Sequence, residues 1–219
     1  MPTLAVLPMK RFDGAKQRLE DQYTPGERRA LAEAMFSDVL VALRRSASVN
    51  EVLVISEDRG AQQIAAGYGA LVRAESDSGH NPAAIAGIRE GLERGADRAL
   101  LVPGDCPMLD PTQLEQLLAR AAPVRSALIV PDRHGTGTNA LLLTPPDVLE
   151  PSFGPGSCQR HAANAESNGI AHEVIAVPSL ALDVDTAEDL QALRVALASM
   201  HGGAAHTRGM LNQLMRSRA

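Results

Sequence analysis

Three aspartates at the ends of apolar segments are the residues of this sequence best suited to chemistry. Asp105 follows the apolar run 99–102 after a Pro-Gly pair. Asp183 and Asp185 stand two positions apart in an extended segment, so both carboxylates face the same way. No basic residue adjoins this pair, and two carboxylates that converge repel each other unless a divalent cation lies between them. The pattern favours a Mg²⁺ site, because hard oxygen ligands suit this ion.

Asp105 has an alternative role as the N-cap of the helix that follows it. Asp110 fits that role better, because it stands directly before Pro111 and proline is favoured at the first helical position. Open α/β sheets bind ligands at the carboxyl ends of their strands. We therefore expect Asp105 to belong to a functional site.

A basic loop follows the first apolar segment, residues 3–8. It holds Lys10, Arg11, Lys16 and Arg18 in a protein whose net charge is −5. These are either solvated loop charges or, given their place after the first strand, a site for phosphate groups. The chain has no GxGxxG or GxxxxGK[ST] pattern, so neither a dinucleotide fold nor a P-loop is supported.

Two glycine turns rich in hydroxyls are further candidates for ligand binding. The turn 132–139 (DRHGTGTN) is either a plain hairpin or, through exposed amides and hydroxyls, an anion site. The turn 153–157 (FGPGS) precedes a predicted helix at about 158–168, whose N-terminus favours a phosphate or carboxylate near Ser157. Together with the aspartates and the basic loop, these turns indicate phosphoryl or nucleotidyl transfer. The six scattered histidines and the lack of a G-x-S-x-G pattern disfavour hydrolysis by a catalytic triad.

The apolar segments predict the scaffold that positions these residues. With 45% hydrophobic but only 2% aromatic residues, the core must be aliphatic, which suits a parallel sheet covered by helices. We expect a three-layer α/β/α fold with a mostly parallel sheet, as a single domain over residues 1–200 followed by a tail, 201–219, that is helical or disordered. The expected strands are 3–8, 49–55, 70–73, 99–102, 127–131, 140–143 and 172–177, and the expected helices are 24–46, 60–67, 83–91, 111–121, 158–168 and 186–200. Asn81 is expected either to cap helix 83–91 or to contact a nucleotide base.

Charge and composition also limit the partners. No basic face precedes the tail, no signal peptide is present, and no apolar run approaches the ~18 residues that span a bilayer. We expect a soluble, cytoplasmic protein with reduced thiols that binds neither nucleic acid nor membrane. The amphipathic tail, with Arg208, Arg216 and Arg218, is either a frayed end or a helix that docks on a second subunit, which would make a homodimer.

Five short motifs stand in a specific combination. They are Pro8-Met-Lys10 with Ala15-Lys-Gln-Arg-Leu19, Asp105-Cys-Pro107, the segment 132–141, Phe153-Gly-Pro-Gly-Ser157 and Leu182-Asp-Val-Asp-Thr186. In these motifs the chain resembles the CofC/FbiD guanylyltransferases of deazaflavin coenzyme F-420 biosynthesis over about residues 3–200. The resemblance implies a nucleotide-diphospho-sugar transferase (glycosyltransferase-A-like) fold. It also implies an enzyme that uses GTP and Mg²⁺ to guanylylate a small phosphorylated acid, with release of pyrophosphate.

The resemblance also implies roles for individual residues. Thr138, Gly154 and Ser157 would bind the substrate acid, and Asp105, Asp183 and Asp185 would bind the metal. Lys10, Lys16 and Arg18 would bind the triphosphate and act in catalysis. Ser56 and Asn81 would contact the base. Family members use 2-phospho-L-lactate, phosphoenolpyruvate or 3-phospho-D-glycerate. Cys106 stands where many members carry leucine. Its smaller, more polar side chain would contact the substrate and leave room for the extra hydroxyl of 3-phospho-D-glycerate, which favours this acid as the substrate. Alternatively, it is a neutral packing change.

Two rival hypotheses remain at this point. The first is another nucleotidyltransferase of the same fold, acting on molybdopterin or a sugar phosphate. Such an enzyme would carry a G-x-x-x-R-M-type loop, where this chain has Pro-Met-Lys. The second is a non-catalytic nucleotide-binding module, which has no need for three acidic positions.

Overall fold

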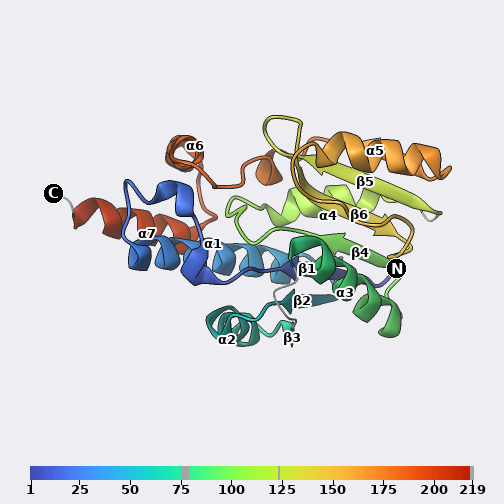
Figure 1. Ribbon diagram of the computed structural model, residues 1–219, viewed down its shortest axis with the longest axis horizontal. Helices are drawn as coiled ribbons and strands as arrows, with labels where there is room; N and C mark the ends of the chain where they lie inside the picture. The colour runs from blue at the N-terminus through green and yellow to red at the C-terminus, as the bar shows by residue number, and fades with distance from the viewer. Residues whose placement is uncertain (75–78, 123, 218–219) are drawn as a thin grey trace.

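A seven-stranded sheet runs through the middle of the protein (Figure 1). The computed structural model describes residues 1–74, 79–122 and 124–217. The strand order is β3-β2-β1-β4-β6-β5-β7. Strand β6 runs antiparallel to β4 and β5, and the other paired strands are parallel, which confirms the mostly parallel sheet. The strands are β1 (Thr3–Pro8), β2 (Glu51–Ile55), β3 (Leu71–Arg73), β4 (Arg98–Leu101), β5 (Ser126–Pro131), β6 (Thr138–Thr144) and β7 (Ala171–Val174).

Helices cover both faces of this sheet and complete the three layers (Figure 1). One face packs against α1 (Pro25–Arg45), α2 (Arg59–Gly67) and α4 (Pro111–Arg120). The other packs against α3 (His80–Glu93) and α5 (Ser157–Ser167). Successive strand residues serve opposite faces, so Leu7 is buried with α1 while Val6 is buried with α3. The aliphatic composition therefore supplies two cores, one on each side of a single sheet.

The helix starts agree with the sequence except at α3. Thr24 and Thr186 form capping boxes, and Asp110 caps α4 through the N–H of Gln113, the role expected of it. Asn81 was expected to cap a helix at 83–91, but α3 begins at His80 with Gly79 as its N-cap. Gly79 has a φ of +103°, which glycine adopts without the steric cost of a Cβ. This places Asn81 inside the first turn, where its side chain is free to bind another loop.

The segment after residue 200 forms a helix that packs against another helix of the same chain. Helices α6 (Ala187–Ser199) and α7 (Ala205–Arg216) bury apolar side chains against α1 in a third cluster that includes Leu31, Leu211 and Leu214. The Asp38 carboxylate of α1 accepts hydrogen bonds from the backbone N–H groups of His206 and Thr207 and from the Thr207 hydroxyl. The segment is therefore not a frayed end but an ordered helix up to Arg216. Arg218 lies outside the described residues.

Short 3-10 turns shape two of the connecting segments. Strand β7 ends at Val174, three residues before the expected end, and Pro178 then opens a short 3-10 turn, η3 (Pro178–Leu180). Two similar turns, η1 (Phe12–Gly14) and η2 (Gln17–Leu19), shape the basic loop after β1. Within the described residues, no helix is long and apolar enough to cross a membrane.

Candidate active site

The two acidic segments meet at the carboxyl end of β4. Gly104 lets the Met9 side chain pack closely on the backbone there, because a Cβ at this position would lie 2.3 Å from the Met9 sulfur. The backbone N–H of Val184 then donates to the carbonyl oxygen of Asp105 at 3.3 Å. Val184 is fully buried, so its neighbours Asp183 and Asp185 both turn into the cleft that Asp105 also lines. The three aspartates thus line one cleft.

Lys16 lies between two of these carboxylates. Its Nζ donates to Asp105 Oδ2 at 2.5 Å and to Asp185 Oδ1 at 3.0 Å. Burial alone lowers the pKa of Lys16, but the charges and hydrogen bonds of the two aspartates outweigh it and raise the pKa above its ordinary value. The expectation that the acidic pair lacks a basic neighbour was wrong, because Lys16 comes from a loop 169 residues away in sequence from Asp185.

The acidic cluster fits a divalent cation only in part. Within the ranges the structure describes, no three His, Cys, Asp or Glu side chains converge as a metal-binding set. The ammonium group of Lys16 explains this, since it neutralises Asp105 and Asp185 directly. However, Asp105 Oδ1 is buried without a hydrogen-bond partner, and an oxygen of this kind suits Mg²⁺, which binds one or two carboxylates together with substrate phosphates.

Asp183 is held by a residue that the sequence argument had not assigned a role. Asn139 Nδ2 donates to Asp183 Oδ1 at 3.1 Å and to the carbonyl oxygen of Leu180 at 2.8 Å. Burial and the nearby charge of Asp105 raise the pKa of Asp183, and the Asn139 hydrogen bond opposes this shift. A carboxylate with a raised pKa is stabilised in its ionised form by a positive charge placed next to it.

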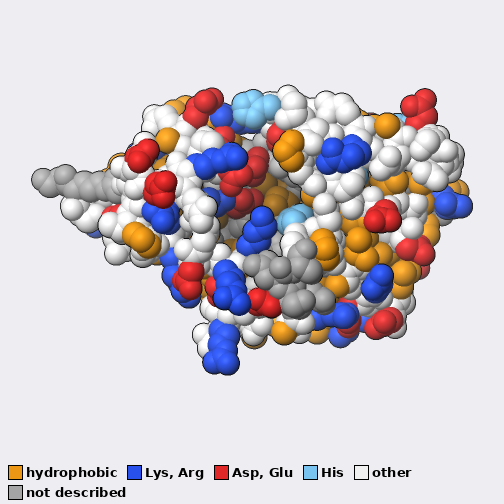
Figure 2. Space-filling model, viewed as in Figure 1, with side chains coloured by type: hydrophobic (Ala, Val, Ile, Leu, Met, Phe, Trp, Pro, Cys, Tyr) orange, Lys and Arg blue, Asp and Glu red, His pale blue; other side chains and the backbone are white. Residues whose placement is uncertain are grey.

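The cleft combines these carboxylates with cations of the basic loop. Figure 2 shows the hollow in the middle of one face, where acidic, basic and histidine side chains gather. Two adjoining cavities of about 780 and 490 Å³ share Lys10, Arg18 and Asp105 in their walls. The loop is anchored from below by Asp58, whose Oδ2 accepts the N–H of Phe12 at 3.0 Å. The space is large enough for a nucleotide and a second small ligand.

The two glycine turns form the opposite wall, but their backbone groups are used differently than expected. Thr138, Gly154 and Ser157 line the larger cavity. In the first turn the Asp132 carboxylate accepts the N–H groups of His134 and Thr136, so those amides are not free for an external anion. The turns also present a pair of hydroxyls to the cleft, in which Ser157 Oγ donates to Thr138 Oγ1 at 3.1 Å.

Two histidines in this region were missed by the sequence argument. His161 is fully buried on α5 and contacts Thr138 and Ser152. His80 lines the cleft, and burial lowers its pKa, with the charge of Lys10 adding to the effect and that of Asp105 opposing it. The i, i+4 spacing of Ser157 and His161 was the available signal, since it places both side chains on one face of a helix.

Ser56 and Asn81 lie near the cleft but in different settings. Ser56 lines a narrow pocket that it shares with Lys10 and His80, and its hydroxyl accepts the N–H of Asp58. Asn81 binds both backbone groups of Phe153, accepting its N–H at 2.7 Å and donating to its carbonyl at 3.2 Å. Asn81 therefore ties the start of α3 to the second glycine turn.

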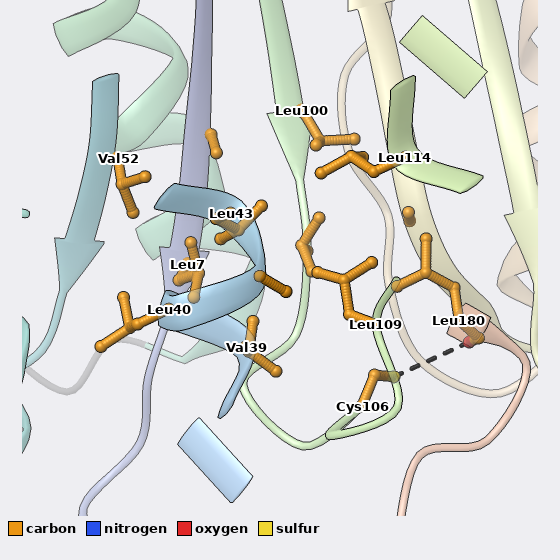
Figure 3. Close-up of a cluster of buried hydrophobic side chains, with 14 of the residues drawn as sticks. Leu7, Val39, Leu40, Leu43, Val52, Leu100, Cys106, Leu109, Leu114 and Leu180 are labelled. Carbon is orange, nitrogen blue, oxygen red and sulfur yellow. Dashed lines mark hydrogen bonds between the residues drawn. The ribbon is translucent and has the colours of Figure 1, made fainter. Parts of the chain in front are cut away.

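Cys106 is directed away from the cleft, although it follows Asp105 in sequence. It is completely buried in the hydrophobic cluster beneath α1, and its thiol donates to the carbonyl oxygen of Leu180 at 3.7 Å (Figure 3). Burial raises the pKa of this thiol, and the charge of Asp105 adds to the effect. No atom of Cys106 is available for a ligand, so the predicted direct substrate contact does not agree with the structure. Its placement agrees with the alternative, a change in core packing.

Comparison with known sequences identifies the family. The sequence profile of the CofC-like guanylyl transferases matches residues 3–217. The chain belongs to this family. A phosphoenolpyruvate guanylyltransferase from Conexibacter woesei is 55% identical over 219 residues, covering 99% of this chain and 98% of the relative. A 3-phospho-D-glycerate guanylyltransferase from Colwellia psychrerythraea is 36% identical, with 88% and 91% covered. A 2-phospho-L-lactate guanylyltransferase from Methanothermobacter thermautotrophicus is 33% identical, with 98% and 92% covered.

Solved structures place this CofC-like chain in the expected fold. A protein from Desulfovibrio desulfuricans G20 assigned to the nucleotide-diphospho-sugar transferases superposes with a TM-score of 0.78 at 16% identity, covering 99% and 98% of the two chains. A 4-diphosphocytidyl-2C-methyl-D-erythritol synthase superposes with a TM-score of 0.63 at 19% identity, with 90% and 98% covered. At these identities the likeness shows the fold. The family membership favours guanylyl transfer over both rival hypotheses.

Proposed function

We propose that this protein transfers GMP from GTP to the phosphate of a small three-carbon phospho-acid, with release of pyrophosphate, in coenzyme F-420 biosynthesis. One observation carries the proposal: a single cleft is lined by cationic side chains, by three aspartates and by a hydroxyl pair beside a helix N-terminus. Both substrates are polyanions, so their reaction requires positive charge and hydrogen-bond donors in one place.

The reaction needs no nucleophile from the protein. An oxygen of the acid's phosphate attacks the α-phosphorus of GTP, and a new oxygen–phosphorus bond forms. The bond from the α-phosphorus to the oxygen that bridges it to the β-phosphorus breaks, and pyrophosphate leaves with the bonding electrons. A phosphate dianion carries no proton on its attacking oxygen, so no general base is required either. The work of the chain is positioning and charge stabilisation.

The basic loop is suited to the triphosphate. We assign Lys10, Lys16 and Arg18 to this role, because all three belong to the wall of the cleft that also contains Asp105. Lys16 would exchange its two aspartate partners for phosphate oxygens when the nucleotide binds.

The aspartates are suited to a cation that arrives with the nucleotide. Asp105, Asp183 and Asp185 would hold Mg²⁺, with the unpartnered Oδ1 of Asp105 as the first oxygen available. When bound, Mg²⁺ would neutralise charge on the triphosphate. Asp185 becomes free for this role as Lys16 turns to the phosphates.

The second glycine turn is suited to the acid. We assign Thr138, Gly154 and Ser157 to it, since Ser157 begins α5 and the helix dipole favours an anion there. On the nucleotide side, Ser56 lies in the wall of the narrow pocket next to Lys10 and is our candidate for contact with the base. Asn81 would contribute to the nucleotide side of the cleft through its two hydrogen bonds to the backbone of Phe153.

Among the three acids of this family we propose phosphoenolpyruvate. Support comes from the Conexibacter woesei relative, which is named for that substrate and is 55% identical over nearly the whole chain. The reason for preferring 3-phospho-D-glycerate was the room that Cys106 would leave for its extra hydroxyl, and the burial of Cys106 in the core removes that reason.

The experiment is incubation of the protein with [α-³²P]GTP and Mg²⁺ against each of the three acids, with pyrophosphate release and labelled product followed together. We expect turnover with phosphoenolpyruvate and a higher kcat/KM for it than for the other two acids. Turnover with another acid alone would move the substrate assignment, and no turnover with any of them would refute the proposed reaction.

A further inference from the structure

His161 lies beneath the pair of hydroxyls that faces the cleft, and it has no access to solvent. Both of its ring nitrogens have partners. Nε2 accepts the backbone N–H of Ser152 at 2.9 Å, and Nδ1 lies 3.0 Å from Thr138 Oγ1. Phe153 packs edge-on against the ring at a centroid distance of 5.3 Å and shields it from the cleft. The imidazole is thus a fixed structural element with two defined polar contacts.

The first of these contacts determines where the ring carries its proton. A backbone N–H can only donate, so Nε2 must be the unprotonated nitrogen. The neutral ring then carries its hydrogen on Nδ1, and Nδ1–H donates to Thr138 Oγ1. Burial, aided by the charge of Arg160, lowers the pKa of His161 to about 4, so the ring is neutral at physiological pH.

The direction of this hydrogen bond fixes what the two hydroxyls offer to a ligand. Thr138 Oγ1 accepts from His161, and it lies 3.1 Å from Ser157 Oγ. The two hydroxyls have two protons, and one is used in the bond between them. Ser157 Oγ donates to Thr138 Oγ1, and Thr138 cannot donate to the protonated Nδ1, so the Thr138 proton is left to point into the cleft. The pair therefore acts as a donor toward the cleft, which suits an oxyanion of the ligand.

We propose that His161 is a positioning residue that makes the Thr138–Ser157 pair a hydrogen-bond donor for an oxyanion of the phospho-acid. The inference rests on the proposed function, because it assumes that the acid binds at this pair. His161 lies behind the hydroxyls and acts through Thr138. Without a donor in the place of Nδ1, the hydroxyl of Thr138 would no longer be held in one orientation, and the pair would bind the acid less tightly.

Two substitutions separate the two contacts of the ring. In His161→Gln, the amide oxygen takes the place of Nε2 and accepts the Ser152 N–H, but the donor to Thr138 is lost. In His161→Asn, the amide nitrogen takes the place of Nδ1 and still donates to Thr138, but the Ser152 N–H loses its acceptor. His172→Gln, on the exposed edge strand β7, is the matched control for replacement of a histidine.

We expect His161→Gln to raise the KM for the acid about tenfold or more, because Thr138 loses the donor that orients its hydroxyl and the hydrogen bond from the pair to the charged acid is weakened. Its KM for GTP and its melting temperature should stay near those of the wild type. His161→Asn should keep the KM for the acid within about threefold of the wild type while its melting temperature falls, and His172→Gln should change neither quantity.

The inference is overturned if both His161 variants raise the KM for the acid equally, or if the KM for GTP rises with it. Either result would mean a general structural role. Equilibrium binding of the acids to the wild type, by calorimetry, separates this from failure of the proposed function. If the wild type binds none of the three acids, the proposed function fails and the inference fails with it. If the wild type binds and converts an acid and His161→Gln leaves the KM unchanged, the inference alone fails.

Discussion

Replacement of Lys16 by methionine tests how the acidic cluster is neutralised. The Lys16 side chain is 7% exposed, while those of its partners Asp105 and Asp185 are 26% and 53% exposed. Removing one partner of a buried ion pair costs about 3–5 kcal/mol. Because Asp185 is half exposed and screened by water, we expect a smaller loss of about 2 kcal/mol in the free energy of unfolding. For a chain of this length that loss lowers the melting temperature by about 4–8 °C.

Magnesium should reverse most of this loss in Lys16→Met. Without the ammonium group, Asp105, Asp183 and Asp185 are left with mutual repulsion, which a divalent cation relieves. A cation at about 100 times its dissociation constant stabilises the folded state by about 2.7 kcal/mol. The wild type should respond less, because Lys16 competes with the cation for two carboxylates.

Differential scanning fluorimetry with and without Mg²⁺ measures both effects. The control is Lys10→Met, which removes an exposed cation from the same cleft and should change stability by less than about 0.5 kcal/mol. The reasoning is refuted if Lys16→Met melts at the wild-type temperature, or if Mg²⁺ stabilises it no more than it stabilises the wild type.

Further expectations concern single side chains. Asp105→Asn and Asp185→Asn should each abolish Mg²⁺-dependent turnover while circular dichroism shows a folded protein; wild-type rates in both would contradict the metal assignment. Cys106→Leu should cost about 1–3 kcal/mol in chemical denaturation through overpacking, and the ranking of the three acids by kcat/KM should not change. Asp38→Ala removes the hydrogen bonds that fix the start of α7, and we expect about 2 kcal/mol lower stability with an unchanged KM for both substrates. The folded protein lowers the pKa of His161 from 6.5 to about 4, so the unfolded chain binds more protons between these values. Stability is then fully present above about pH 6.5 and falls by roughly 2–3 kcal/mol as the pH drops toward 4, and urea midpoints of His161→Gln should lack this part of the pH dependence.

The fold could be predicted from the sequence because its signals are local. Short aliphatic runs that alternate with capped helices specify a parallel sheet between two helical layers, and Thr24, Asp110 and Thr186 mark helix starts by side-chain chemistry alone. The start of α3 was misplaced because two signals competed. Asn81 before Pro82 is a good cap, but Gly79 can adopt the positive φ that begins the helix earlier.

The residues that line the cleft could be predicted from the sequence, but the contacts between them could not. The strand ends and glycine turns identified the segments that meet, and the alternation around Val184 gave the direction of Asp183 and Asp185. That Lys16 would lie between Asp105 and Asp185 depends on how a long loop folds back, which no local pattern encodes. Cys106 was assigned to the cleft by its neighbour in sequence. The turn after Gly104 sends the two side chains in opposite directions, one to the cleft and one to the core.

In the proposed reaction the phosphate of the acid itself attacks GTP. The most direct test is ³¹P nuclear magnetic resonance of the wild-type protein with GTP, Mg²⁺ and phosphoenolpyruvate. We expect a pair of coupled doublets from a new unsymmetrical diphosphate, together with an equal amount of pyrophosphate. Formation of GMP or GDP with inorganic phosphate, and no coupled pair, would contradict it.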